Sequence, residues 1–403
     1  MNDLNQHLAQ QLQNLEQEGL LRHLVPLTQL SGGRIDVSGK TYLNLSSNDY
    51  LGLAANREFI SSFYAQLKPE SLLEQFGPGS SASRLMTGNS QLYEQLEQKL
   101  ADLYKSQRAL VFNSGYHANA GILPALAEKG DLIVADKLCH ASLIDGMRLS
   151  RAESLRYRHL DYDHLSNILE EKRKQYNRVF VVSESVFSMD GDLVDLRKLV
   201  DLKEQFNCVL YLDEAHAVGV YGSKGLGLAE QEELVGDIDI LLGTFGKALA
   251  GLGGFVACSE EVADYLVNRA RPFIYSTSLP PVCLNWLLFV LDRVPTMVKE
   301  REKLHRLAEN LRQELLREGL MTGGSSQIIP VLIGDSGKTI SVAEKLRASG
   351  FWVTAVRPPT VPANTARLRL SLSAAFTPAD LASLPSLIKT TLDSMTAKND
   401  GHT

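Results

Sequence analysis

The sequence is poor in the features that mark secreted, membrane-spanning or nucleic-acid-binding proteins. Its 403 residues include only four cysteines, which are scattered, as is typical of reduced thiols in a cytoplasmic protein rather than of a disulfide framework. The apolar run LNWLLFVL at 284–291 is far too short to cross a membrane, and the polar N-terminal stretch is not typical of a signal peptide. A net charge of −6 predicts no general attraction to nucleic acid or to an anionic membrane.

Short apolar runs alternate with helix-like stretches from residue 108 onward. The runs cover residues 109–112, 132–135, 179–184, 209–214, 238–244 and 254–258. Continuous apolar strands separated by helices predict an α/β fold, with a mostly parallel central sheet covered by helices on both faces. After about residue 290 a charged helix (298–318) leads into a smaller α+β region.

These changes along the chain predict three parts. Leucines at helical spacing (4, 8, 12 and 15) predict an N-terminal helix, so residues 1–50 form a helix and short strand segment. Residues 51–290 form a large α/β domain, and residues 291–403 form a small C-terminal α+β domain. Because ligands bind beyond the carboxyl ends of the strands in such sheets, we expect the main site in the large domain.

Polar residues follow several of the predicted strands. They are Ser114, Gly115 and Tyr116 after the first run, His140 after the second, Ser188 after the third, Asp213 at the end of the fourth with His216 after it, and Thr244 at the end of the fifth with Lys247 after it. The turn at 114–116 leads into a helix, where free backbone N–H groups and the helix dipole favour a phosphate. The ends of separate strands therefore supply a phosphate site, a carboxylate, two imidazoles and a lysine.

Lys247 lies in the segment LLGTFGKALAGLGG (241–254), where glycines flank it on both sides. A surface lysine needs no such surroundings, whereas a lysine that bonds covalently to a flat ligand does, because the backbone must approach that ligand closely. Pyridoxal 5′-phosphate (PLP) needs the whole set: an amine for its aldehyde, a carboxylate for its ring nitrogen, amides and hydroxyls for its phosphate, and a flat side chain for its ring. Each residue alone has an ordinary structural explanation, and their joint placement predicts the cofactor.

Other ligand sites lack the motifs that they require. DEAH at 213–216 suggests an ATPase, but no G-x-x-x-x-G-K-[ST] loop is present. We expect no metal site, because neither H-E-x-x-H nor paired cysteines occur. The glycines of GPGSSASRLMTG do not match the dinucleotide pattern G-x-G-x-x-G.

Motifs along nearly the whole chain resemble those of the α-oxoamine synthases, fold-type-I PLP-dependent transferases that condense an amino acid with an acyl thioester. The motifs are FNSGYHANAG, CHASL, SVFSMDGD, LDEAHAVGVYG, GTFGKALAG and YSTSLPP, within a match that runs from 44–53 to 366–377. The segments SRLMTGN and FWVTAVRPPTVPANTARLRLSLSA resemble the biotin-pathway branch of this family. That branch joins L-alanine to a pimeloyl thioester, carried on coenzyme A or on acyl carrier protein.

The resemblance implies a role for each residue near the cofactor. Lys247 forms a Schiff base with the cofactor and moves the proton of the substrate Cα. Asp213 pairs with the ring nitrogen, His140 stacks on the ring, and His216 and Ser188 approach its phenolic oxygen. The phosphate contacts are Ser114, Gly115, Tyr116 and Thr244, joined by Ser276 and Thr277 from the second subunit of a homodimer with shared sites.

The resemblance also implies substrate contacts and leaves alternatives. Arg369 binds the amino-acid carboxylate, with Asn48 nearby, and Arg22 and Arg357 meet the distal acyl carboxylate or coenzyme A. A glycine C-acetyltransferase, an autoinducer-type synthase or another family member would share the main motifs, although RPPTVP disfavours the first. A non-catalytic partner subunit is disfavoured because Lys247 and both histidines are present.

Overall fold

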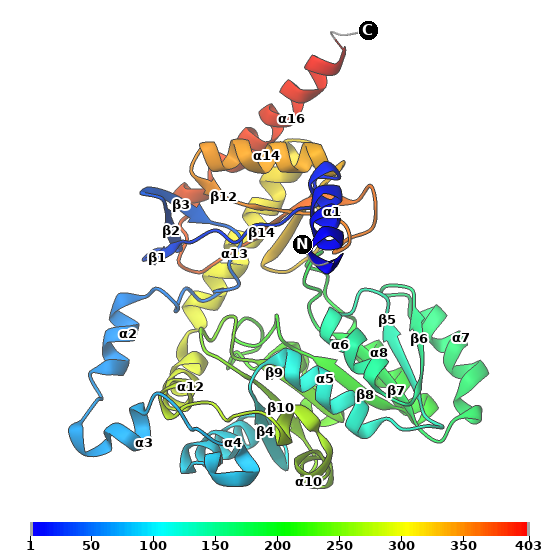
Figure 1. The fold of residues 1–403 in the computed structure, drawn as a ribbon. Helices are drawn as coiled ribbons and strands as arrows, with labels where there is room; N and C mark the ends of the chain where they lie inside the picture. The colour runs from blue at the N-terminus through cyan, green and yellow to red at the C-terminus, as the bar shows by residue number, and fades with distance from the viewer. Residues whose placement is uncertain (1–2, 401–403) are drawn as a thin grey trace. The chain divides into compact units, whose positions relative to one another are not determined.

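The chain forms two compact units in a computed structural model, which describes residues 3–400 (Figure 1). The larger unit comprises Asp49–Ser188 and Asp192–Lys303. The smaller unit comprises the N-terminal residues through Asn48, the short segment Met189–Gly191 and the residues from Leu304 onward. The smaller unit is therefore built from three separate segments of the chain.

A seven-stranded sheet forms the centre of the larger unit, with strand order β4-β10-β9-β8-β7-β5-β6. Its strands are β4 (Arg108–Phe112), β5 (Leu132–Asp136), β6 (Glu153–Tyr157), β7 (Val179–Glu184), β8 (Val209–Asp213), β9 (Ile240–Thr244) and β10 (Gly254–Cys258). Only β10 runs antiparallel to its neighbours, β4 and β9, and the other pairs are parallel. The predicted α/β fold with a mostly parallel sheet is confirmed.

The helices of the larger unit are α2 (Arg57–Tyr64), α3 (Leu72–Phe76), α4 (Gln91–Tyr104), α5 (Gly115–Leu126), α6 (Ala141–Leu149), α7 (Tyr162–Lys172), α8 (Leu196–Phe206), α9 (Leu228–Gln231), α10 (Glu260–Arg269), α11 (Arg271–Ile274) and α12 (Pro281–Arg293). Of these, α4, α5, α7, α8 and α10 contact the strands, whereas α2 and α3 lie away from the sheet (Figure 1). Side chains of α5, α6 and α10 share one hydrophobic core with alternate strand residues such as Ile133 and Ala135. Among the described residues no single helix is long and apolar enough to span a membrane, and the bent pair 281–296 and 298–317 meets that test by length and composition only.

Strand β6 has no counterpart among the predicted apolar runs. Its sequence ESLRY is exposed or partly exposed except at Tyr157, because β6 lies at the edge of the sheet. An edge strand needs fewer apolar residues than a strand buried on both faces. The search for apolar runs therefore could not find this strand.

The smaller unit contains two sheets of its own. One has the order β1-β2-β3-β12 and the other β11-β14-β13. Its strands are β1 (Thr28–Leu30), β2 (Arg34–Val37), β3 (Lys40–Asn44), β11 (Ile328–Gly334), β12 (Phe351–Trp352), β13 (Thr354–Val356) and β14 (Ala366–Ser371). Its helices are α1 (Asp3–Gln17), α14 (Ser336–Ala348), α15 (Pro378–Leu381) and α16 (Leu384–Asp400), and α13 (Val298–Arg317) enters it from the larger unit.

The boundaries of these units differ from the predicted division at residues 50 and 290. Strand β3 pairs in parallel with β12, so the N-terminal strands and the C-terminal region share one unit. The larger unit also continues through α12 to Lys303. Pairing between segments that are distant in the sequence leaves no signal in local composition, which explains the difference.

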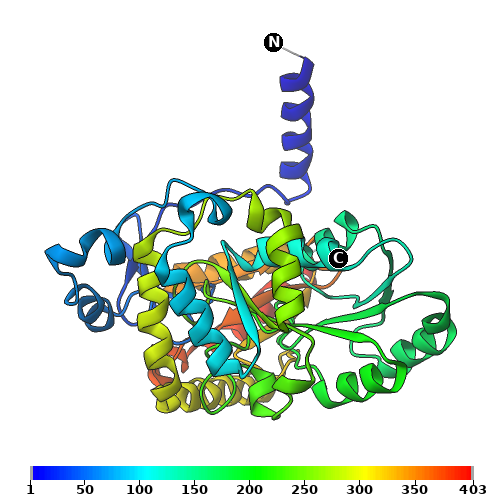
Figure 2. The same cartoon turned by 90° about the horizontal axis from the view of Figure 1, so that it is seen from below.

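The predicted N-terminal helix is present as α1, but its leucines are exposed. Leu4, Leu8, Leu12 and Leu15 are between 38% and 60% exposed, and no residue of α1 is buried. Figure 2 shows α1 standing clear of the strands of its own unit. Helical spacing of leucines thus predicts the helix correctly without predicting burial of its apolar face.

His159 connects strand ends at the carboxyl edge of the large sheet. Its Nδ1 lies 2.9 Å from Asp136 Oδ1, its Nε2 lies 3.2 Å from Asp192 Oδ2, and its ring packs edge-on against Phe187. Burial lowers the pKa of His159, but the hydrogen bonds to both carboxylates outweigh burial and raise that pKa to about 9. The imidazolium is therefore a cross-link between the end of β5 and the segment after β7.

This cross-link predicts a pH-dependent stability. Because the pKa of His159 is raised on folding from 6.5 to about 9, its stabilisation is complete below pH 6.5 and is lost as the pH rises through 9. We expect His159→Gln to remove about 1–3 kcal/mol of unfolding free energy at pH 6 and much less at pH 10. Urea unfolding at both values measures this, with His7→Gln on α1 as the control. Equal losses at the two pH values would contradict it.

Candidate active site

Two carboxyl groups lie side by side at the carboxyl edge of the sheet. Asp213 ends β8 and Glu184 ends β7, and the two residues are direct partners in the parallel register. Both are buried, at 5% and 3% exposure. Burial, followed by the negative charge of Asp213, raises the pKa of Glu184 to about 8. Glu184 therefore holds a proton at neutral pH, and the pair carries about one negative charge rather than two.

His140 follows β5 and begins helix α6. Its backbone N–H donates to Glu184 Oε1, and its Nδ1 accepts a hydrogen bond from the backbone N–H of Ser142 at 3.2 Å. Burial lowers the pKa of His140, and the charge of Lys247 lowers it further while Asp213 acts in the opposite direction. The imidazole is therefore neutral at pH 7, and its orientation is fixed by the helix that it caps.

His216 lies three residues after Asp213 and is 4% exposed. Its Nδ1 lies 2.6 Å from the hydroxyl of Tyr50, whose ring is tilted against the imidazole. Ser188 lies beyond the end of β7, partly exposed, as the last residue of the larger unit before Met189. The predicted strand-end residues thus belong to the larger unit.

Lys247 lies in a closed turn between β9 and β10. Its backbone carbonyl accepts a hydrogen bond from Ala250 N at 2.9 Å, and its side chain is partly exposed. The charge of Lys247 acts on both His140 and Glu184, so the structure brings these three residues together.

The glycines around Lys247 have a packing cause within the chain itself. A Cβ on Gly243 would lie 2.3 Å from the ring of Phe255, and one on Gly251 would lie 2.5 Å from Leu287. Real Cβ atoms do not approach so closely, so a side chain at either position would require Phe255 or Leu287 to shift. Close packing within the chain therefore accounts for Gly243 and Gly251, but not for Gly246, where a Cβ would meet nothing closer than 3.7 Å.

The residues predicted for a phosphate surround the first turn of α5. Ser114 caps this helix by accepting a hydrogen bond from His117 N at 3.1 Å. A Cβ on Gly115 would meet Thr244 at 3.5 Å, so the helix start and the end of β9 are neighbours. The Thr244 hydroxyl donates to Gly253 O at 3.0 Å. Tyr116 is exposed in this first turn and donates its hydroxyl hydrogen to Asp145.

Ser276 and Thr277 follow the short helix α11. Ser276 is partly exposed and Thr277 is exposed. The backbone carbonyl of Thr277 accepts a hydrogen bond from Asn113 Nδ2 at 2.6 Å, which places this segment beside the end of β4 in the same chain. Their contribution to the site of a second subunit stays a prediction.

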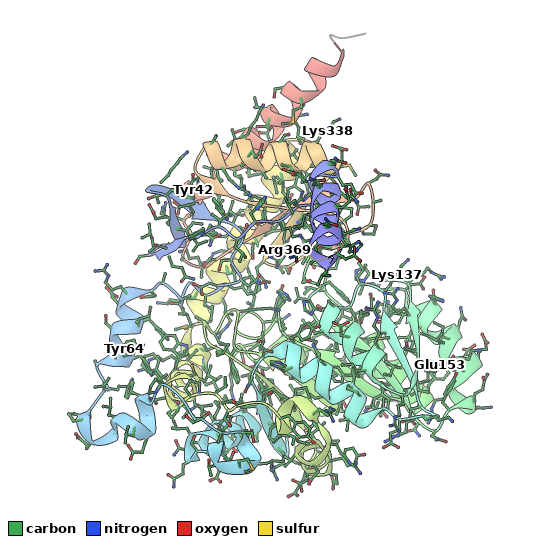
Figure 3. All side chains as sticks on the ribbon, in the orientation of Figure 1. Tyr42, Tyr64, Lys137, Glu153, Lys338 and Arg369 are labelled. Atoms are coloured by element: carbon green, nitrogen blue, oxygen red, sulfur yellow. The ribbon has the colours of Figure 1, made fainter. Side chains whose placement is uncertain are left out.

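The four predicted substrate residues lie in the smaller unit. Arg369 is on β14, the central strand of its sheet, and is labelled in Figure 3. Its Nη2 donates to Asn48 Oδ1 at 3.1 Å, so the two residues predicted for the amino-acid carboxylate are in contact.

Arg22 and Arg357 are also brought near each other. Arg22 Nη2 donates to Thr360 Oγ1 at 3.1 Å, and Arg357 donates to the backbone carbonyl of Gly19. Burial, followed by the positive charge of Arg22, lowers the pKa of Arg357. Two neighbouring guanidinium groups repel each other, and a shared anion would relieve that repulsion.

Three residues without a predicted role contribute directly to this arrangement. Glu184 and Tyr50 contact the two histidines, and Asn119 donates to Asp213 Oδ2 at 2.7 Å. Asn119 offers one signal in the sequence, because it is an amide within an otherwise apolar helix segment, NAGILPAL. Tyr50 and Glu184 offer none, since a tyrosine in a turn and a glutamate ending a strand are common.

The donor set of the larger unit fits PLP. It combines a buried carboxylate at Asp213, a neutral and oriented imidazole at His140, an amine at Lys247, and a helix start beside a threonine hydroxyl for a phosphate. Among the described residues no group of three or more His, Cys, Asp or Glu side chains is placed to hold a metal ion.

Comparison with known proteins decides the family. The aminotransferase class I and II family matches residues 40–386. The chain belongs to this family. An 8-amino-7-oxononanoate synthase from Chlorobaculum parvum is 48% identical over 371 residues, covering 92% of this chain and 95% of the relative.

Solved structures of class I and II aminotransferase relatives share the fold. A serine palmitoyltransferase from S. paucimobilis with a bound PLP–myriocin aldimine has a TM-score of 0.89 at 29% identity, covering 98% of this chain and all of the other. An 8-amino-7-oxononanoate synthase from Francisella tularensis has a TM-score of 0.73 at 28% identity, covering 88% and 99%. The predicted fold-type-I architecture and the resemblance to α-oxoamine synthases are confirmed.

The protonated state of Glu184 is open to a direct test. A neutral glutamine can still accept from the backbone N–H of His140, so we expect Glu184→Gln to change the unfolding free energy at pH 7 by less than about 1 kcal/mol. Glu184→Leu leaves that N–H unsatisfied and is expected to cost about 1–3 kcal/mol more. Chemical denaturation of both variants measures the difference. Equal destabilisation by the two substitutions would contradict a neutral Glu184.

Proposed function

We propose that the protein catalyses the decarboxylative condensation of L-alanine with a pimeloyl thioester to give 8-amino-7-oxononanoate, carbon dioxide and the free thiol. It is a PLP-dependent acyltransferase. The observation that carries the proposal is the grouping of Lys247, Asp213 and His140 at one edge of the sheet. The choice of substrates is supported by 48% identity to the C. parvum 8-amino-7-oxononanoate synthase over almost all of both chains.

The chain's own residues have distinct tasks in this reaction. When bound, PLP supplies an aldehyde that bonds to an amine and a ring that accepts electrons from the substrate Cα. Asp213 would accept a hydrogen bond from the protonated ring nitrogen, His140 would present a flat neutral face, and His216 with Ser188 would face the phenolic oxygen. The phosphate would be held by Ser114, Gly115, Tyr116 and Thr244, with Ser276 and Thr277 of a second subunit.

Proton transfer falls to Lys247. Its Nζ would remove the proton from the alanine Cα and return one after the loss of carbon dioxide. A lysine acts as a base only as the neutral amine, so release of this nitrogen from its bond to the cofactor is a requirement for the step. Asp213 would hold a proton on the ring nitrogen and so strengthen the electron-accepting character that the cofactor supplies.

The smaller unit would supply substrate recognition. The planar guanidinium of Arg369, oriented by Asn48, suits bidentate binding of the alanine carboxylate. The neighbouring Arg22 and Arg357 suit the distal carboxylate of the pimeloyl group or a phosphate of coenzyme A.

Other members of the family are the main rivals. A glycine C-acetyltransferase would share the cofactor residues and would need no anion site at the far end of its short acyl group. A serine palmitoyltransferase is favoured by the higher TM-score but has only 29% identity to this chain. The paired arginines and the 48% identity favour the pimeloyl substrate.

We also propose that the protein is a cytoplasmic homodimer. The four cysteines of the chain are free thiols, as expected in a reducing compartment. The partly exposed Ser276 and exposed Thr277 are available to complete the phosphate contacts of a second subunit.

Loss of the lysine should separate catalysis from folding. We expect Lys247→Ala to reduce turnover at least about 10³-fold, while the protein remains folded and still binds PLP without a covalent bond. Absorption spectra, circular dichroism and thiol release measure these properties, with Lys172→Ala on α7 as the control. Turnover near that of the wild type would remove Lys247 from the proposed role.

Substrate preference tests the assignment within the family. We expect thiol release to be most efficient with alanine and pimeloyl-CoA, compared with glycine or acetyl-CoA. A methyl group in a matched pocket contributes about 1–3 kcal/mol, so glycine should be disfavoured rather than excluded. Arg22→Ala and Arg357→Ala should lower the preference for pimeloyl-CoA over acetyl-CoA about tenfold.

The exposed Arg317→Ala on α13 provides the matched control for these arginine variants. If glycine with acetyl-CoA gives the highest kcat/KM, the protein is a glycine C-acetyltransferase. If the preference for pimeloyl-CoA survives both substitutions, the activity stands and the roles of Arg22 and Arg357 are wrong.

A further inference from the structure

A polar network beneath the carboxyl edge of the large sheet joins Asp213 to His140. Its centre is Asn119 on α5, which is 1% exposed. Asn119 Nδ2 lies 2.7 Å from Asp213 Oδ2 and 2.9 Å from Ser142 Oγ, and its Oδ1 lies 2.6 Å from the hydroxyl of Tyr211. Ser142 Oγ in turn lies 2.8 Å from His140 Nδ1.

Hydrogen bonds in this network can point in only one direction. The Asp213 carboxylate accepts from Asn119 and from Ala215 N, so the NH₂ group of Asn119 faces it and the amide oxygen faces Tyr211. Tyr211 is fully buried, and burial followed by the charge of Asp213 raises its pKa well above the ordinary value. The phenol therefore keeps its proton and donates it to Asn119 Oδ1. The second N–H of Asn119 goes to Ser142 Oγ.

The direction of the network decides which nitrogen of His140 carries hydrogen. The backbone N–H of Ser142 donates to His140 Nδ1 at 3.2 Å, so this nitrogen is an acceptor. The Ser142 hydroxyl, which accepts from Asn119, therefore donates its own hydrogen to the same Nδ1. A nitrogen that accepts two hydrogen bonds carries no proton, so the neutral ring has its hydrogen on Nε2.

We infer that Asn119 is a positioning residue that sets the hydrogen-bonding state of both groups assigned to the cofactor ring. It gives Asp213 a donor suited to the ionised carboxylate, beside the 2.8 Å hydrogen bond from Ala215 N to Oδ1. Through Ser142 it holds His140 in the tautomer with a bare Nδ1. The inference rests on the roles proposed for Asp213 and His140, but it does not depend on which substrates the enzyme takes.

The position of Asn119 on α5 suits this task. It lies one turn after Gly115 on the helix whose start is assigned to the phosphate, and it packs on the same face of the sheet as Tyr211. Tyr211 and Asp213 point to that face because alternate residues of a strand share a side. The same helix thus carries Gly115, which is assigned to the phosphate, and Asn119, which contacts Asp213.

Histidine NMR of the cofactor-free, ¹⁵N-labelled protein tests the tautomer, with His140→Gln identifying the signals of His140. We expect wild-type His140 to have a protonated Nε2 and a bare Nδ1. Ser142→Ala removes one of the two donors to Nδ1, so it should raise the fraction of the other tautomer while changing PLP affinity less than about threefold, since Asp213 keeps Asn119. Asn119→Asp should mix the tautomers and also weaken PLP binding about tenfold, the effect of losing one hydrogen bond to a charged group.

Tyr104→Phe is the matched control, because it removes another buried hydroxyl of the larger unit, one that donates to Leu226 O at 2.6 Å. It should lower stability and leave both readouts unchanged. Unchanged His140 signals in Ser142→Ala overturn the inference, even if Asn119→Asp fails to fold. Unchanged PLP affinity in a folded Asn119→Asp also overturns it. A different substrate preference would overturn the proposed function alone, because neither readout involves a substrate.

Discussion

The placement of two carboxyl groups on adjacent buried strand ends is the constraint on which the arrangement of this site depends. Asp213 and Glu184 cannot both ionise in a buried position without a large cost, and the raised pKa of Glu184 shows how the chain resolves this. The protonated Glu184 is held by the backbone of His140, and Asp213 is held by Asn119 and Ala215. His140 at the start of α6 and Asn119 on α5 therefore hold a pair of carboxyl groups that carries a single negative charge.

The scaffold meets this constraint with ordinary packing rather than with strain at the reactive groups. Parallel strands deliver the two acids to the same edge, and helices that pack on the sheet bring their caps to that edge. The glycines near Lys247 belong to the same account, because Phe255 and Leu287 occupy the space that their side chains would need. A glycine-rich segment beside a reactive residue can therefore reflect the core beneath it as much as the ligand above it.

Much of the larger unit could be predicted from the sequence, because six apolar strands and the polar residues at the ends of five of them are local features. Strand β6 could not, since an edge strand such as ESLRY need not be apolar. The contact of Asn119 with Asp213 joins positions 94 residues apart, and no pattern of spacing encodes it. The same holds for β3 with β12, whose pairing places the N-terminal strands with the C-terminal region. The sequence therefore predicts the residues at strand ends, such as Asp213, but not the side chains that contact them, such as Asn119.

The contact between Arg357 and the carbonyl of Gly19 has a thermodynamic consequence for the N-terminal segment. Together with the hydrogen bond from Arg22 to Thr360, it ties the residues that follow α1 to the segment around β13. An anion bound by both guanidinium groups would strengthen these ties, because it removes the repulsion that opposes them. Binding of an anion at Arg22 and Arg357 would then stabilise the attached conformation of the residues that follow α1. The resistance of this segment to proteolysis would therefore rise with the concentration of the acidic thioester.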